Sequence, residues 1–190
     1  VYILSAPLVF PAAHGGRGLS VVDGTLRASS AFPQGRFVIE LNVSNAEWVA
    51  GVTFEDVTLS NVVVDANDYA DGLLCSHCNH VVVDAVWIAN FINVGYRMYN
   101  GHENYLSNSW ISQRTAKLNG TGVQLGSADS SMVDTVIFQV KLGFDITAGN
   151  SELANIHIFD AGHYQYAGPD MPALWPFGGG YVRSHDVRMV

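Results

Sequence analysis

Residues 71–88, DGLLCSHCNHVVVDAVWI, contain the pattern that decides the fold. Three later stretches repeat its order: a leading glycine, a short apolar strand, a polar corner, a second strand, an Asp or Asn, and a third strand. They are VGYRMYNGHENYLSNSWI (94–111), TGVQLGSADSSMVDTVIF (121–138) and LGFDITAGNSELANIHIF (142–159). Successive glycines lie 23, 27 and 21 residues apart, at Gly72, Gly95, Gly122 and Gly143. A repeat of this length with three short strands predicts a solenoid.

The apolar pattern within each repeat favours strands over helices. HVVVDAVWI (80–88) and NYLSNSWI (104–111) alternate or run short and β-branched, whereas a helix would space its apolar residues three and four apart. We therefore expect an all-β chain with few helices, folded as a right-handed single-stranded parallel β-helix. Its handedness follows from the rule that such crossovers are right-handed in about 98% of cases.

The length of 190 residues predicts one domain. We expect irregular early coils in residues 1–50, regular coils in 51–163, a loop insertion in 164–180 that caps a groove or meets a partner, and a further turn from Gly180. The chain begins without Met or a basic leader and ends on the strand-like VRSHDVRMV (182–190). We expect a piece of a longer secreted protein, without its end caps.

Charge excludes two classes of partner. The formal net charge is −8 and the nine basic residues are scattered, so neither nucleic acid nor a membrane surface is expected as a partner. No apolar run reaches the roughly 18 residues of a membrane-spanning helix. The sequons at 42–44 and 119–121 are compatible with a secreted glycoprotein. The oligomeric state stays open.

A single CxxC pair lies in the first repeat, with Cys75, His77, Cys78 and His80 interleaved. A zinc or redox site is one interpretation, but zinc takes about four ligands and the chain has no second cysteine pair. We favour small buried side chains beside polar turn residues. The sequence predicts no metal and no cofactor.

An Asp or Asn recurs 12 or 13 residues after each leading glycine. Asx side chains tolerate the left-handed backbone region and bond neighbouring turn backbones, so this position predicts a structural ladder between coils rather than a catalytic set. Its members are Asp84, Asn108, Asp134 and Asn155.

Alternation within the first strand of each repeat separates inward from outward residues. The inward positions are apolar in all four repeats, whereas the outward positions become mainly polar after the first. The outward residues are Leu74 and Ser76, Arg97 and Tyr99, Gln124 and Gly126, and Asp145 and Thr147. We expect this row to face solvent on coils about 4.8 Å apart. It is typical either of a groove for a sugar chain or of a solenoid's ordinary solvated face.

A polar corner follows that row, predicted at His77 in the first repeat, at His102 and Glu103 in the second, and at Asp129 in the third. Neighbouring carboxylates can supply the protonated and the ionised carboxyl that glycoside hydrolysis requires, although each could equally cap its own corner. His102 either orients a carboxylate or is a surface residue. The predicted catalytic residues are Glu103, Asp129 and Asp145, and the predicted substrate-binding residues are Arg97, Tyr99, His102, Gln124 and Asp71.

Several stretches carry a resemblance to a known family: VVDGTLRASSAFP (21–33), FEDVTLSNVVVD (54–65), YNGHENYLSNSWISQ (99–113) and NGTGVQLGSADSSMVDTVIF (119–138). Through them the chain resembles the pectin-lyase-like superfamily and, within it, polygalacturonase-like proteins of the plant QUARTET type. The resemblance implies a right-handed β-helix, location in the cell wall, and hydrolysis of α-1,4-linked galacturonan, an acidic polysaccharide.

Residue by residue, the resemblance covers part of the family's motifs. Asp71 and Gly72 match the end of an Asn-Thr-Asp-Gly motif, and Thr121 stands where a Gly-His-Gly motif has its histidine. The INVGYRM stretch (92–98) has no aspartate pair, and no Arg-Ile-Lys occurs. A glycosidase with a different carboxylate set is therefore expected. The alternatives are a catalytically silent wall-binding or structural β-helix and a Ca²⁺-dependent polysaccharide lyase that uses Arg97 as its base.

Overall fold

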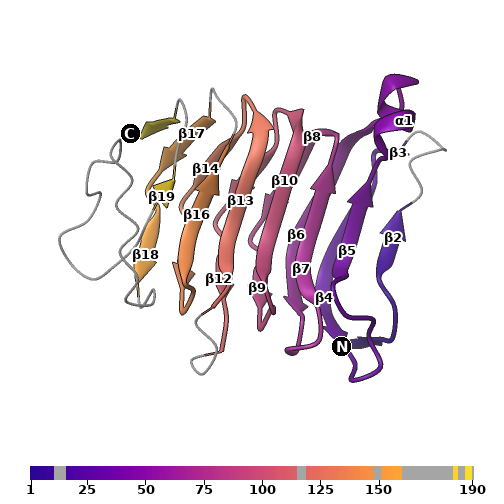
Figure 1. The fold of residues 1–190 in the computed structure, drawn as a ribbon, viewed down its shortest axis with the longest axis vertical. Coiled ribbons are helices and arrows are strands. Elements are labelled where there is room, and N and C mark those ends of the chain that lie inside the picture. The colour runs from indigo at the N-terminus through magenta and orange to yellow at the C-terminus, as the bar shows by residue number, and fades with distance from the viewer. Residues whose placement is uncertain (11–15, 115–118, 148–150, 160–181, 184–186, 190) are drawn as a thin grey trace.

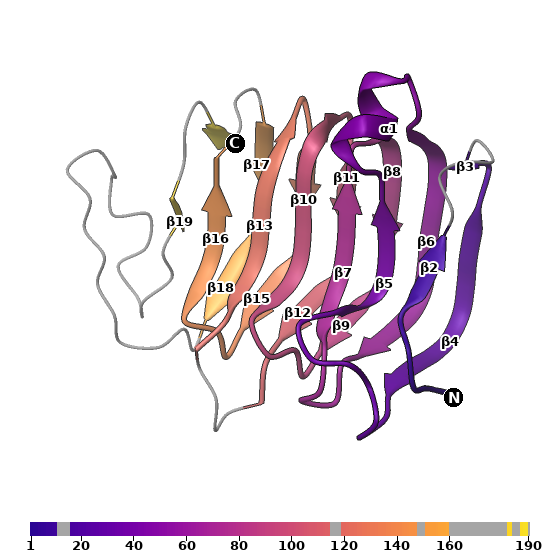
Figure 2. The ribbon, with the colours of Figure 1, turned by 45° about the vertical axis from the view of Figure 1, so that its right-hand side comes forward.

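The computed structural model describes residues 1–10, 16–114, 119–147, 151–159, 182–183 and 187–189. Across these ranges the chain forms twenty strands and one five-residue helix, α1 (Asn45–Val49). Neighbouring strands pair in parallel, and the chain winds into a β-solenoid of about six turns. Figures 1 and 2 show the coils stacked side by side from the N-terminal to the C-terminal end. The predicted all-β parallel β-helix is confirmed, and its handedness stays a prediction.

The parallel pairings of successive coils line the strands up in three faces, which form the first, second and third sheets. The first sheet contains β2 (Leu8–Phe10), β5 (Phe37–Asn42), β7 (Asp71–Ser76), β10 (Val94–His102), β13 (Thr121–Ala128), β16 (Leu142–Ile146) and β19 (Val182–Arg183). The second contains β3 (Gly16–Arg17), β8 (Cys78–Asp84), β11 (Tyr105–Ser107), β14 (Ser131–Val133), β17 (Ser151–Ala154) and β20 (Val187–Met189). The third contains β1 (Tyr2–Leu4), β9 (Trp87–Ala89), β12 (Trp110–Ser112), β15 (Val136–Phe138) and β18 (His157–Phe159). The long strands β4 (Ser20–Ala28) and β6 (Phe54–Asp65) run from the second sheet into the third.

The strand register confirms the alignment by leading glycines. Tyr96 pairs with Leu73 on one side and Val123 on the other, which places Gly72, Gly95 and Gly122 in one column. A Cβ on Gly72 would stand 2.2 Å from the carbonyl oxygen of Gly95. The column is therefore glycine because the next coil's backbone leaves no room for a side chain. Gly180 lies outside the described residues.

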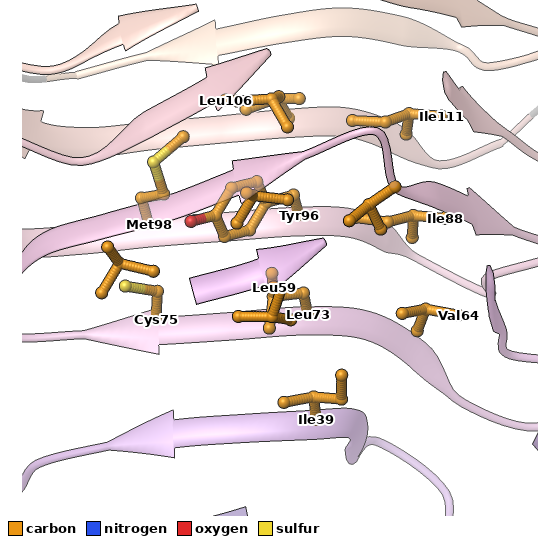
Figure 3. Packing of buried hydrophobic residues seen from close by; sticks show 14 of the residues in the cluster. Ile39, Leu59, Val64, Leu73, Cys75, Ile88, Tyr96, Met98, Leu106 and Ile111 are labelled. Atoms are coloured by element: carbon orange, nitrogen blue, oxygen red, sulfur yellow. The ribbon is translucent and has the colours of Figure 1, made fainter. Parts of the chain in front are cut away.

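The core fills the interior of the solenoid, where like positions of successive coils stack (Figure 3). Burying one such side chain contributes about 1.5–3 kcal/mol, so these stacks hold the coils together. The first sheet supplies Ile39, Leu73, Tyr96, Val123 and Phe144, and beside them Leu41, Cys75, Met98, Leu125 and Ile146. The second sheet supplies Leu59, Val83, Leu106, Met132 and Leu153, and the third supplies Val64, Ile88, Ile111 and Ile137.

Residues 1–50, where irregular early coils were expected, contain the strands β1, β2, β3, β4 and β5. Sequence reasoning did not place α1, which follows β5 and begins at a capping box: Glu47 N donates to Ser44 Oγ, and Ser44 N donates to the Glu47 carboxylate. The predicted insertion at 164–180 lies outside the described residues. No helix in the described ranges is long and apolar enough to cross a bilayer.

The CxxC cysteines are both buried and free, as the structural interpretation predicted. Burial raises the pKa of the Cys78 thiol, so it stays protonated at neutral pH. His77 is buried and bonds the carbonyl of Val43, whereas His80 is exposed. Among the described residues no three His, Cys, Asp or Glu side chains are grouped as a metal site would require.

Candidate functional site

The predicted outward row lies in register on the first sheet. Arg97 pairs with Leu74 and with Gln124, and Gln124 pairs with Asp145. The three polar residues are half-buried, and Leu74 is only 8% exposed because it packs with Phe37. The expectation that the whole row faces solvent is therefore wrong at Leu74, where a neighbouring coil supplies an apolar cover. It is also wrong at Ser76, which is fully buried and donates its hydroxyl to the carbonyl of Val43.

Arg97 is held in place from two sides. Its Nε donates to Gln124 Oε1 at 2.6 Å, and its guanidinium carbon lies 5.4 Å from the centre of the Phe37 ring. The ring face attracts the cation and fixes its position. Within the described residues no hydrogen bond occupies the two terminal nitrogens of Arg97, so they can bind an anion.

Glu40 lies in the same row, one coil before Leu74, and was not predicted. Its carboxylate accepts from Arg36 Nε at 2.8 Å and Nη2 at 2.6 Å, and also from the backbone N–H of Phe37. The hydrogen bond to Glu40 raises the pKa of Arg36. Period-two alternation puts residues 36 and 40 on one face of a strand, a signal that could have revealed this pair. The Glu40 carboxylate is therefore already bound to Arg36 and to the backbone of Phe37. Arg97 is the first cation of the row that can bind a ligand.

Asp145 carries an unusual carboxylate. Its Oδ1 is buried and has no hydrogen-bond partner among the described residues. Burying a carboxylate oxygen without a partner is costly, so such an atom in a native fold calls for a functional or ligand-dependent explanation. Its register neighbours are Gln124 on one side and Arg183 on the next coil. Asp145 is therefore the strongest single polar candidate in the row.

The corner between the first and second sheets repeats one backbone conformation on four coils. Asp56, His80, Glu103 and Asp129 have φ values of 55°, 54°, 54° and 51°. Glu103 N donates to the carbonyl of Ala128, which places Glu103 and Asp129 side by side, and both side chains are exposed. The predicted equivalence of these two corners is confirmed.

His77 does not share that position, contrary to expectation. The pairing of β10 with β7 and β8 sets His77 beside Asn100, and it sets His80 beside Glu103. The register between β10 and β13 shifts between Tyr99 and His102, where the second repeat carries one extra residue. This bulge explains why Glu103 lies eight residues after Gly95 and Asp129 seven after Gly122. His77 lies only five residues after Gly72, three short of the equivalent position at His80.

His102 lies next to Asp129, with Nδ1 and Oδ2 separated by 3.7 Å and both side chains more than half exposed. At that distance the pair is a weak ion pair that forms when His102 is protonated. His102 is therefore placed where it can influence Asp129, as the orienting role requires.

Asn104 anchors this corner and was missed by sequence reasoning. It is buried; its Oδ1 accepts from Val81 N at 3.1 Å, and its Nδ2 donates to Cys78 O at 2.9 Å and Ser127 Oγ at 2.8 Å. One amide thereby links three successive coils directly behind Glu103. A polar residue between two apolar strands gives no sequence signal of burial, which explains the miss.

A depression of about 430 Å³ lies at the same corner. Trp48 of α1 stands on one side, and its ring lies 5.1 Å from that of His77, which in turn lies 6.0 Å from the ring of Tyr99. The volume is within the range of small-molecule sites. The lining residues are Trp48, His77, Asn100, Gly101, His102, Gly126 and Ala128.

The structure separates the three predicted catalytic carboxylates. Asp145 pairs with Gln124, and Asp129 follows Gln124 by five residues along the same strand and corner. At about 3.3 Å per residue, Asp145 lies roughly 16 Å from the corner. Glu103 and Asp129 can therefore act on one bond, whereas Asp145 lies with Arg97 and Gln124 at another part of the face.

Asp71 is placed away from both groups. It is 5% exposed, and its Oδ1 accepts from the backbone N–H of Asn93 at 2.6 Å and of Val94 at 3.1 Å. It lies at the start of β7, the end opposite the corner. These contacts give Asp71 the role of joining two coils.

The predicted Asx ladder is present at the corner between the second and third sheets. Asn108 Nδ2 donates to Asp84 Oδ1 at 2.8 Å, and Asn155 Nδ2 donates to Asp134 Oδ1 at 3.0 Å. Asp84 itself pairs with Ser107, one position before the Asn108 that the recurring Asx pattern predicted, and Ala85 occupies the left-handed position of that coil. The ladder is therefore structural, with a one-residue offset in its first coil.

The architecture defines the class of protein. A parallel β-solenoid with three sheets, buried stacks and a polar outer row is consistent with the pectin-lyase-like superfamily. The chain is 30% identical over 168 residues to "Polygalacturonase QRT3" of Arabidopsis thaliana, a match that covers 84% of the chain. This chain is a distant homologue of that plant polygalacturonase, and it spans 34% of the relative's length. No family model and no solved structure matches the chain.

Proposed function

We propose that this chain is the β-helical part of a secreted glycoside hydrolase that cleaves pectin-type polygalacturonan. One observation carries the proposal: in a distant homologue of a polygalacturonase, the first sheet presents a cation in its outward row and two exposed carboxylates at the corner that follows. A chain of galacturonate residues lying along these strands would contact both. Such a substrate implies location outside the cell, in the wall.

Arg97 supports an acidic substrate. Polygalacturonan carries a carboxylate on each sugar, and a planar guanidinium binds a carboxylate through two parallel hydrogen bonds. The contacts with Gln124 and Phe37 hold the guanidinium in one position before substrate arrives. The fixed cation therefore loses little conformational entropy on binding.

Glu103 and Asp129 support the chemistry. They lie on adjacent coils, which are about 4.8 Å apart, so their side chains can flank one glycosidic bond. One carboxyl would protonate the leaving oxygen, and the other would activate water or attack the sugar directly. Trp48 and Tyr99 offer aromatic surface beside the depression for the neighbouring sugar rings.

A second candidate, a wall-binding β-helix without catalysis, is favoured by one observation. Asp71, which matches part of the family's catalytic motif, is buried and bound to two backbone amides. A chain that uses this aspartate for structure could keep the groove and lose the reaction.

Incubation of the chain with polygalacturonate distinguishes these functions when reducing ends and the ultraviolet absorbance of unsaturated products are followed together. We expect reducing ends to rise without absorbance. A parallel rise in absorbance would indicate a lyase, and binding without new ends would indicate the silent protein.

Arg97→Ala should weaken binding of polygalacturonate by roughly tenfold to a hundredfold, the usual loss for a hydrogen bond to a charged group. Arg114→Ala is the matched control, because Arg114 is half exposed and pairs with Asp68 away from the row. Equal effects of the two substitutions would remove Arg97 from the site.

A further inference from the structure

Two exposed tryptophans lie side by side on the outer face of the third sheet. Trp87 of β9 and Trp110 of β12 are register partners on adjacent coils, and they are 47% and 51% exposed. Tryptophan is highly buried on average, so two exposed rings on neighbouring coils are unusual. Grouped apolar surface of this kind marks interaction sites.

Both rings are held in place. Trp87 Nε1 donates to Ser112 Oγ across the coil boundary at 3.3 Å. The Trp110 ring meets Phe138 of the next coil edge to face, with ring centres 6.1 Å apart and planes at 90°. Rings fixed in this way lose little freedom when a ligand stacks on them.

The rings border a hollow of about 620 Å³. It has the make-up of a small-ligand site, mostly apolar with a few polar groups. Asn108 supplies an amide at its edge: Nδ2 donates to Asp84, while Oδ1 has no hydrogen bond among the described residues. The lining residues are Ala85, Val86, Trp87, Asn108, Trp110 and Phe138.

The charge of this hollow determines what it can accept. None of its lining residues is charged, and the carboxylate bonded to Asn108 belongs to Asp84. Hydrogen bonds from Ser107 and Asn108 lower the pKa of Asp84, so it is ionised at neutral pH. A negative group beside the hollow repels an acidic sugar and leaves a neutral one unaffected.

We propose that this hollow binds a neutral hexose unit of a polysaccharide, with the apolar C–H face of the pyranose stacked on the indoles of Trp87 and Trp110. The amide oxygen of Asn108 accepts a hydrogen bond from a hydroxyl group of the same sugar. The chain would then hold a neutral glycan on its third sheet, independently of any reaction at the first sheet. Such a site would keep the protein on a mixed wall polymer.

Native gel electrophoresis in gels that contain hydroxyethyl cellulose, a soluble neutral polymer of hexopyranose units, tests the proposal. The wild-type chain should be retarded in proportion to polymer concentration. Trp110→Ala should weaken the apparent affinity at least tenfold. Tyr69→Ala, which removes an exposed aromatic ring that does not line the hollow, should retain the wild-type affinity and serves as the matched control.

Asn108→Ala is the second variant, because an exposed corner residue can be replaced without disturbing the core. It should weaken the affinity for the neutral polymer about threefold. Circular dichroism checks that each variant is folded. Absence of retardation by the neutral polymer would overturn the proposal. So would retardation by polygalacturonate that Trp110→Ala abolishes, which would indicate an acidic ligand. A dimer that Trp110→Ala dissociates would also overturn it, because a second copy would then cover the face.

Discussion

Two corners of each coil use the same backbone conformation for different purposes. Between the first and second sheets, Glu103 and Asp129 adopt the left-handed region, and between the second and third sheets Asn108 and Asp134 do so. In the latter corner, side chains bond from coil to coil, as Asn108 does to Asp84. In the former, the Glu103 carboxylate has no hydrogen bond among the described residues. The first of these corners also carries one bond between coils, from His80 Nδ1 to Asp56 Oδ1 at 2.6 Å, but it leaves the Glu103 side chain free.

The largest expected effect contrasts the two corners by activity. Glu103→Gln keeps the shape of the side chain but cannot transfer a proton, so hydrolysis of polygalacturonate should fall by roughly 10² to 10⁴. Asp129→Asn should behave similarly. Asp84→Asn, in the ladder corner, should leave kcat unchanged. The measurement is release of reducing ends by the three folded variants.

Asp145→Asn refines that test, because Asp145 lies roughly 16 Å from the corner pair. We expect it to change KM more than kcat, as a binding residue does. A loss of kcat as large as that of Glu103→Gln would indicate that the reaction takes place at the outward row, beside Asp145, rather than at the corner. Full activity in Glu103→Gln would show that its corner is only a turn.

The next effect concerns backbone packing at the exposed corner. A Cβ on Gly101 would lie 2.1 Å from Cys78 O and 2.9 Å from Cys78 N, and no side-chain rotation relieves a clash with backbone. Gly101→Ala should therefore destabilise the fold by about 3 kcal/mol, the upper end for overpacking. Gly126→Ala meets its nearest atom, Thr147 Oγ1, only at 3.1 Å and is the control. Equal melting temperatures of the two variants would contradict the close approach of Gly101 to the backbone of Cys78 on the neighbouring coil.

Asn104 and Asn108 compare a buried and an exposed amide at the two corners. Asn104→Ala removes the side-chain partner of the buried Val81 N–H and of the Cys78 carbonyl, so we expect a loss of about 2–3 kcal/mol in the free energy of unfolding. Asn108→Ala removes one exposed hydrogen bond and should cost less than about 1 kcal/mol. Urea unfolding measures both, and a larger loss for Asn108→Ala would reverse the assignment of roles.

Much of the fold followed from the sequence because the constraints repeat. The glycine column and the inward apolar rows are imposed again on each coil, so an error in one repeat is corrected by the next. The outward row of Arg97, Gln124 and Asp145 and the paired corners of Glu103 and Asp129 followed from the same alignment.

What could not be predicted depends on single events. The bulge at Tyr99–His102 offset Glu103 from Asp129 by one residue, and α1 placed Trp48 beside His77. The burial of Asp71 and Asn104 depends on backbone groups of other coils, which a sequence pattern does not identify. The polarity of Asp71 and Asn104 therefore suggested an outward position. It did not show that both side chains are already hydrogen-bonded to backbone groups of other coils.

The smallest expected effect concerns the acid range. Hydrogen bonds from Ser107 and Asn108 lower the pKa of Asp84 in the folded chain, below the value near 3.9 of an unfolded aspartate. The stability that this carboxylate contributes is therefore present above pH 4 and is lost as pH falls through the folded pKa. Because the group is near the surface, we expect a contribution below about 1 kcal/mol. Urea unfolding at pH 7 and pH 3 should show wild type more stable than Asp84→Asn at pH 7, with a smaller difference at pH 3. A difference of the same size at both pH values would mean that the shape of the Asp84 side chain, rather than its charge, holds the ladder, and the two corners would then differ less.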